Sequence, residues 1–120
     1  MTDPSIVLLY VDSPQGSAVF YSELLGRRPL EASQKFAMFE MSPGVRLGLW
    51  ARHDVEPHAT VPGGQEIAFT VTDEDAVNAT HEDWCKRGMT IAQEPTRMDF
   101  GHTFVALDPD GHRLRVFAPA

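Results

Sequence analysis

The sequence of 120 residues is poor in cysteine and has no long apolar run. Its single cysteine, Cys85, excludes an intrachain disulfide and is typical of a protein from a reducing compartment. No apolar stretch approaches the roughly 18 residues that a membrane span needs. The first residues, MTDPSIVLLY, lack the basic segment and the cleavage site of a signal peptide. These absences predict a cytoplasmic protein with no membrane partner.

Positive charge is also scarce. Ten Lys and Arg stand against 17 Asp and Glu, and the formal net charge is -7. The basic residues are scattered, with clusters only at Arg27-Arg28 and at Arg113 with Arg115. A nucleic-acid-binding protein needs a basic face that displaces counterions from phosphates. We therefore expect neither nucleic acid nor an anionic membrane surface as a partner.

The chain does contain an internal repeat. Residues 43–51, PGVRLGLWA, and residues 110–118, DGHRLRVFA, share a turn glycine followed one residue later by Arg-Leu-x-aliphatic-aromatic-Ala. The x position changes its chemistry completely, from Gly48 to Arg115. Self-similarity of this kind indicates two copies of one structural module.

The first copy has the pattern of a strand, a helix and three further strands. Ser13 is a good helix N-cap, Pro14 suits the first helical position, and Gly26 ends a helix that runs to about Leu25. The predicted strands cover residues 6–11, 29–31, 35–41 and 45–52, and SPG at 42–44 joins the last two as a hairpin.

The second copy repeats this order. Thr72 or Asp73 is expected to cap a helix that continues to Arg87 and ends at Gly88. The predicted strands cover residues 66–71, 89–93, 102–107 and 112–118, with a type I turn at DPDG, 108–111. The prediction is one α+β domain over residues 1–120, built from tandem β-α-β-β-β modules at 5–52 and 64–118 and joined by a linker at 53–63.

Side chains alternate between the two faces of a strand, and the two sets differ in chemistry. The first set is uniformly apolar and should face the helices: Val7, Leu9, Val11, Leu47, Leu49, Ala51, Ile67, Phe69, Val71, Leu114 and Val116. The second mixes aromatic, charged and small residues: Ile6, Leu8, Tyr10, Arg46, Gly48, Trp50, Glu66, Ala68, Thr70, Arg113, Arg115 and Phe117. We interpret the second set as the lining of a cup formed by a curved mixed sheet, with the helices on its outer face.

The segments VLLYVDSPQGSAVFYSELLG, GVRLGLW, IAFTVTD and FVALDPDGHRLRVF resemble the vicinal oxygen chelate superfamily of glyoxalases, extradiol dioxygenases and bleomycin- and phenazine-resistance binding proteins. LLYVDS, LGLW and DFGHTF, with the closing DPDGHRLRVF, are similar to the phenazine-resistance members. The resemblance implies that enzymes of the group place metal ligands at positions matching Ile6, Gly48, Glu66 and Arg115.

These four residues are a poor metal-ligand set. Ile6 and Gly48 have no side-chain donor atom, and Arg115 is a permanent cation. Glu66 alone does not hold a divalent metal, so we expect no metal and no cofactor. We predict that Glu66 pairs with Arg115, either as a structural ion pair at the floor of the cup or as a contact for a ligand.

Flat rings suggest what such a cup would bind. The candidate ligand-binding residues are Trp50, with Gly48 leaving space beside it, and Tyr10, Glu66, Arg115, Phe100, His102, Phe117 and Met38. We interpret the other histidines as surface or loop residues, whereas His102 could rim the cup. Cys85 is expected to be a buried structural thiol, and we predict no catalytic residue.

Three functions remain open. The first is metal-independent binding and sequestration of a planar aromatic antibiotic or phenazine, which would confer resistance. The alternative is a glyoxalase- or dioxygenase-like enzyme, either a metal-dependent lyase or dioxygenase with displaced ligands or a metal-free isomerase with Glu66 as the base. A small regulatory or subunit role is a third, blander possibility.

The apolar residues of the second set also predict that the chain forms an oligomer. Ile6, Leu8, Tyr10, Trp50 and Phe117 together would form too large an apolar patch for a monomer. We therefore predict a homodimer with two identical sites, in which Trp50 of one chain faces Glu66 and Arg115 of the other. The resemblance implies the same arrangement, and linker 53–63 is long enough to permit exchange of modules between chains.

Overall fold

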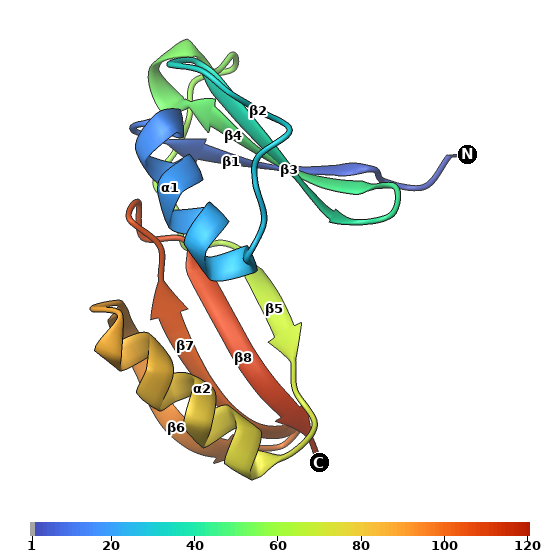
Figure 1. The fold of residues 1–120 in the computed structure, drawn as a ribbon, viewed down its shortest axis with the longest axis vertical. Helices are drawn as coiled ribbons and strands as arrows, with labels where there is room; N and C mark the ends of the chain where they lie inside the picture. Colours follow the sequence, from blue (N-terminus) through green and yellow to red (C-terminus); the bar gives the residue numbers. More distant parts are fainter. Residues whose placement is uncertain (1) are drawn as a thin grey trace. The chain divides into compact units, whose positions relative to one another are not determined.

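A computed structural model describes residues 2–120 of the chain. It contains two α-helices and eight strands in two four-stranded sheets, and the chain divides into two compact units between Val61 and Pro62. In each unit one helix covers one face of a mixed sheet (Figure 1). The predicted α+β class with two tandem modules is confirmed. No helix within residues 2–120 is long and apolar enough to cross a membrane.

The first unit carries its strands in the spatial order β1-β4-β3-β2. The elements are β1 Ile6–Val11, α1 Pro14–Leu25, β2 Glu31–Ala32, β3 Phe36–Ser42, β4 Val45–Ala51 and a 3-10 turn, η1, at Arg52–Asp54. β1 runs parallel to β4, and the other two pairs are antiparallel. The parallel pairing requires a crossover, which α1 supplies.

Local sequence signals define the ends of α1. The Ser13 hydroxyl accepts a hydrogen bond from the Gly16 backbone N–H at 3.1 Å, and Pro14 follows at the first helical position. Gly26 ends the helix in the left-handed conformation, at φ 64°. Each feature satisfies or removes a backbone group that the helix end leaves unpaired, so the predicted bounds of α1 are confirmed.

The second unit repeats the topology in the order β5-β8-β7-β6. Its elements are β5 Glu66–Thr70, α2 Glu74–Lys86, β6 Thr90–Met98, β7 Gly101–Leu107 and β8 Arg113–Pro119. Of the two residues considered as the cap of α2, Asp73 is the correct one, because its carboxylate accepts the Ala76 N–H at 2.8 Å.

Strand β6 is longer than predicted. The sequence predicted a strand over residues 89–93, and Pro95 beyond it lacks the N–H that a strand ladder needs. In the structure, register shifts between Ile91 and Gln93 and between Gln93 and Thr96 accommodate the proline, and pairing with β7 continues to Met98. The segment predicted as linker also begins differently, since η1 occupies Arg52–Asp54 and Val55 is buried.

The predicted division of the sheet faces is confirmed. The helix-facing set supplies a large share of the core, namely Leu9, Val11, Leu47, Leu49, Ala51, Leu114 and Val116. On α2, Trp84 packs edge-to-face against Phe69 and Phe104, at centroid distances of 5.8 and 5.4 Å. Except for buried Gly48, the opposite set is exposed or half-buried, which leaves part of one face of each sheet available to other molecules.

We predict that Gly101→Ala destabilises the protein by about 3 kcal/mol. Gly101 has φ 141°, and a Cβ there would lie 1.9 Å from the backbone oxygen of Ala118. Gly64→Ala is the matched control, since a Cβ at Gly64 meets no atom within 4 Å. Urea unfolding of both variants measures the difference, and an equal stability of the two would show that the close approach of β7 to β8 imposes no constraint.

Candidate functional site

The position that changes between the repeats faces the exposed side of each sheet. In the first unit Gly48 pairs with Leu8, and in the second unit Arg115 pairs with Ala68. Each pair therefore combines one small and one large side chain, but the large one comes from opposite strands in the two units. At this pair each sheet therefore holds one large side chain, which is apolar in the first unit and charged in the second.

The space above Gly48 is filled. A Cβ there would lie 2.7 Å from Leu8 Cδ2 and 2.9 Å from Phe36 Cζ. Our expectation that the glycine opens space beside Trp50 was therefore wrong, because neighbouring apolar side chains occupy that volume. Because Gly48 has no side chain, the side chains of Leu8 and Phe36 can pack directly over its backbone.

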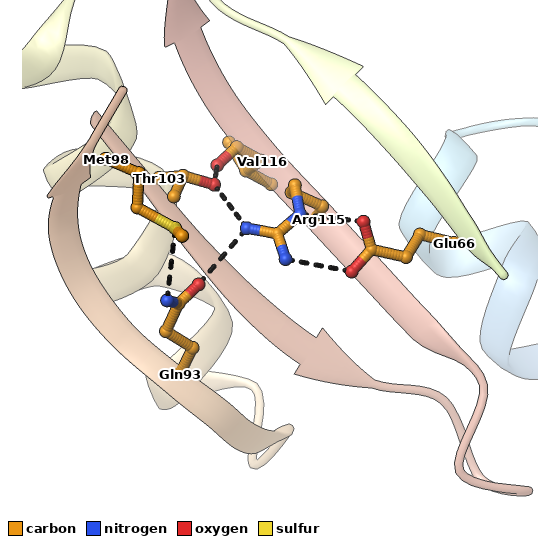
Figure 2. Close-up of polar contacts among 6 residues, drawn as sticks. All are labelled: Glu66, Gln93, Met98, Thr103, Arg115 and Val116. Atoms are coloured by element: carbon orange, nitrogen blue, oxygen red, sulfur yellow. Dashed lines mark hydrogen bonds and ion pairs between the residues drawn. The ribbon is translucent and has the colours of Figure 1, made fainter. Parts of the chain in front are cut away.

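Arg115 and Glu66 form the predicted ion pair. Arg115 Nε donates to Glu66 Oε1 at 2.8 Å, and Nη2 donates to Oε2 at 2.9 Å (Figure 2). This two-pronged geometry matches the planar guanidinium to the planar carboxylate. The Arg115 side chain is 16% exposed and that of Glu66 is 30% exposed. The pairing is confirmed, and Glu66 is the more accessible partner.

Two residues that were not predicted from the sequence accept further hydrogen bonds from Arg115. Its Nη1 donates to Gln93 Oε1 at 3.1 Å and to Thr103 Oγ1 at 3.2 Å. The Thr103 hydroxyl donates in turn to the Val116 carbonyl, and the Gln93 amide nitrogen lies 3.5 Å from Met98 Sδ. Figure 2 shows the guanidinium between Glu66 on one side and Gln93 with Thr103 on the other. Thr103 pairs with Phe117 and therefore lies on the same sheet face as Arg115. The alternation of side chains along β7 and β8 is the sequence signal that could have identified it.

Aromatic rings adjoin this polar cluster. Phe100 is 44% exposed, and its ring centroid lies 5.7 Å from Arg115 Cζ. Phe117 meets Phe100 edge-to-face at 5.8 Å. Rings of this kind supply flat apolar surface next to the charged pair. The second unit therefore brings together four predicted site residues: Glu66, Arg115, Phe100 and Phe117.

The first unit gathers the other predicted aromatic residues. Tyr10 and Trp50 are adjacent across β1 and β4 and meet edge-to-face at 6.2 Å. The register also fixes the side of β3 that could not be assigned from the sequence, because Met38 pairs with Gly48 and Phe36 with Trp50. Directly opposed residues of an antiparallel pair point to the same face. Met38 and Phe36 therefore share the face of Trp50.

Two expectations about polar side chains were wrong. His102 does not share the face of Arg115, because it pairs with buried Ala118 and its Nε2 lies 2.9 Å from Asn78 Oδ1 on α2. It belongs to the helix side of the sheet. Cys85 is exposed and not buried, and its sulfur lies 3.5 Å from His81 Nε2.

The four positions that the resemblance assigns to metal ligands do not fit a metal ion. Ile6 and Gly48 have no donor atoms, and both carboxylate oxygens of Glu66 accept hydrogen bonds from Arg115. A guanidinium at the fourth position adds a positive charge where a cation would have to bind. Within residues 2–120 no group of three or more His, Cys, Asp or Glu is placed to hold a metal.

The electrostatics of the pair fix the ionisation of Glu66. The hydrogen bonds from Arg115 hold the pKa of this carboxyl below its ordinary value of 4.5, against an opposing effect of burial. The charges of Arg115 and Arg113 lower this pKa further. Glu66 is therefore a carboxylate at neutral pH, and its oxygens can only accept hydrogen bonds.

Comparison with known proteins places this architecture in a family. The model of the Glyoxalase/Bleomycin resistance protein/Dioxygenase superfamily matches residues 5–116. The phenazine antibiotic resistance protein EhpR of Enterobacter agglomerans is 28% identical over 116 residues, which cover 94% of this chain and 89% of EhpR.

Solved structures agree with this match. The solution structure of protein ATC0852 from Agrobacterium tumefaciens is 49% identical, with a TM-score of 0.91 and coverage of 100% of this chain and 99% of that one. The crystal structure of a glyoxalase-related enzyme from Fulvimarina pelagi has a TM-score of 0.83 at 22% identity, covering 98% of this chain and 88% of that one. The second likeness shows the shared fold alone.

We predict that the Glu66–Arg115 pair stabilises the protein above pH 4.5 and loses its effect in acid. Because the folded state lowers the pKa of Glu66, its stabilisation is present above the unfolded pKa and is lost as the pH falls through the folded pKa. The stability gap between wild type and Glu66→Gln should therefore be largest near neutral pH and shrink below pH 4.5. Urea unfolding from pH 7 to pH 3 measures it, with exposed Glu31→Gln as the control; a gap that stays constant would contradict this.

Proposed function

This chain belongs to the Glyoxalase/Bleomycin resistance protein/Dioxygenase superfamily, and on that premise we propose that it binds and sequesters a planar aromatic compound of the phenazine class without a metal. Sequestration would make it a resistance protein. The observation that carries this proposal is the chemistry of the exposed sheet faces. They present aromatic rings, and an internally paired Arg115 and Glu66 stand where enzymes would need metal ligands.

The ligand class rests on the rings and on one relative. Trp50 and Tyr10 on the first unit, and Phe100 and Phe117 on the second, offer surfaces on which a flat ligand can stack. EhpR is a phenazine antibiotic resistance protein, and its similarity extends over nearly the whole chain. A tricyclic aromatic ligand suits such surfaces, because stacking depends on shape and polarisability and needs no catalytic group.

The enzymatic alternative has less support. A metal-free isomerase would need Glu66 as a general base, and an efficient base has a pKa near the working pH. Arg115 moves the pKa of Glu66 in the opposite direction and donates one hydrogen bond to each of its oxygens. Binding without turnover is therefore the function that this geometry favours.

We predict micromolar binding of a phenazine and loss of about tenfold in affinity for Trp50→Ala, because the flat indole surface is removed. Titration of phenazine should quench the fluorescence of half-buried Trp50, and calorimetry should give the affinities of the variants. Trp50→Phe should retain most of the affinity, since a flat ring remains.

The controls test specificity and metal independence. Val19→Ala, on the exposed side of α1, should bind as wild type does. An excess of chelator should leave the affinity unchanged. Absence of saturable quenching by phenazines and by a panel of planar antibiotics would count against the proposed function, whereas loss of binding in chelator would count against its metal independence.

We further propose that the protein is a homodimer. Ile6, Leu8 and Tyr10 are 38% to 41% exposed on β1, an edge strand of its sheet, and Trp50 lies beside Tyr10. A contiguous apolar surface on an edge strand is a preferred site of association, and a second copy of the chain would cover it.

Sedimentation should therefore give roughly twice the chain mass of 13.3 kDa at micromolar concentration. Ile6→Lys should shift the equilibrium toward monomer, because it places a charge in the interface. Val61→Lys is the matched control at a position that is 81% exposed. A wild-type protein that sediments as a monomer would contradict the proposed dimer. The proposed phenazine binding is tested separately, by the fluorescence titration.

A further inference from the structure

Most donor hydrogens of the Arg115 guanidinium are engaged by protein acceptors. Arg115 makes four hydrogen bonds to Glu66, Gln93 and Thr103 from Nε, Nη1 and Nη2. The Thr103 hydroxyl donates to the Val116 carbonyl, and the Gln93 amide nitrogen lies 3.5 Å from Met98 Sδ. Four of the five guanidinium N–H groups are therefore engaged within the protein.

The same cluster keeps acceptor capacity. A carboxylate has about four lone-pair positions on its two oxygens, and Arg115 uses one hydrogen bond to each oxygen of Glu66. The Glu66 side chain is 30% exposed, about twice the 16% of Arg115. A ligand at this face thus meets the carboxylate as a hydrogen-bond acceptor, beside exposed Arg113, which pairs with Glu66 across β5 and β8. Most of the Arg115 guanidinium is engaged in the protein network.

A stacking surface adjoins this acceptor. The exposed Phe100 ring lies against the same guanidinium that Glu66 binds, 5.7 Å from Arg115 Cζ. Phe117 supports Phe100 edge-to-face. A flat ligand that rests on Phe100 can therefore direct one of its edges toward Glu66.

We propose that this face selects the redox state of its ligand and binds the reduced, dihydro form of a phenazine more tightly than the oxidised form. This inference rests on the proposed function. The two ring nitrogens of oxidised phenazine carry in-plane lone pairs and only accept hydrogen bonds. Reduction adds two electrons and two protons, one proton to each nitrogen, and creates two N–H donors. An N–H donor complements the Glu66 carboxylate, whereas a nitrogen lone pair is repelled by it.

The test compares both redox states of phenazine itself under anaerobic conditions. Wild type should bind 5,10-dihydrophenazine about tenfold more tightly than phenazine, because a hydrogen bond to a carboxylate is stronger than one between neutral groups. Saturating protein should then raise the midpoint potential of the ligand by about 30 mV, the value of a tenfold ratio in a two-electron couple. 5,10-Dimethyl-5,10-dihydrophenazine lacks N–H groups and should bind no more tightly than phenazine.

Variants assign the effect to Glu66. Glu66→Gln should abolish the preference, because its amide presents a donor as well as an acceptor. Glu82→Gln, on the exposed side of α2, should keep it. Equal binding of the two redox states by wild type would overturn the inference and leave the proposed function intact. Failure of wild type to bind either state would overturn the proposed function, and this inference with it.

Discussion

A permanently charged, largely buried guanidinium on one sheet face is the constraint around which the second unit is organised. Arg115 cannot lose its charge, so its burial is tolerable only when anionic and neutral acceptors surround it. Glu66 on β5, Gln93 on β6 and Thr103 on β7 each contribute, so one side chain of β8 ties together all four strands of its sheet. Removal of any one acceptor would leave a buried donor unpaired, which makes the network a single structural unit.

The two copies of the module share one topology, but at matching positions their side chains differ in chemistry. In the first unit Leu8 and Phe36 fill the volume above Gly48, and the face is apolar. In the second unit Ala68 is the small partner, and Arg115 takes the large place beside it. Each pair thus combines one small and one large side chain, and the large one is apolar in the first unit and charged in the second.

Much of this arrangement follows from the sequence, and the exceptions have physical causes. Caps and strand parity are local properties, so α1 and the helix-facing core could be predicted from them. The Glu66–Arg115 pair was predicted from the family resemblance, which places the first and last strands of one module close together. Gln93 could not, because its contact depends on register shifts around Pro95 in β6 that no local pattern encodes. The facing of His102 was misjudged because it begins the predicted strand 102–107, where the sequence alone does not fix the register; its pairing with Ala118 turns it to the helix side.

Replacing a metal site by an ion pair inverts what the face offers to a ligand. A divalent metal is a Lewis acid and attracts lone pairs of carbonyl or hydroxyl oxygens. Here the charge of Arg115 is largely engaged by protein acceptors, and the Glu66 side chain is the more exposed member of the pair. The paired carboxylate can accept a hydrogen bond from a donor, and exposed Arg113, which pairs with Glu66 across β5 and β8, adds a cation beside it. Because the carboxylate is ionised and held in place by two hydrogen bonds, its geometry supports the proposed binding without turnover.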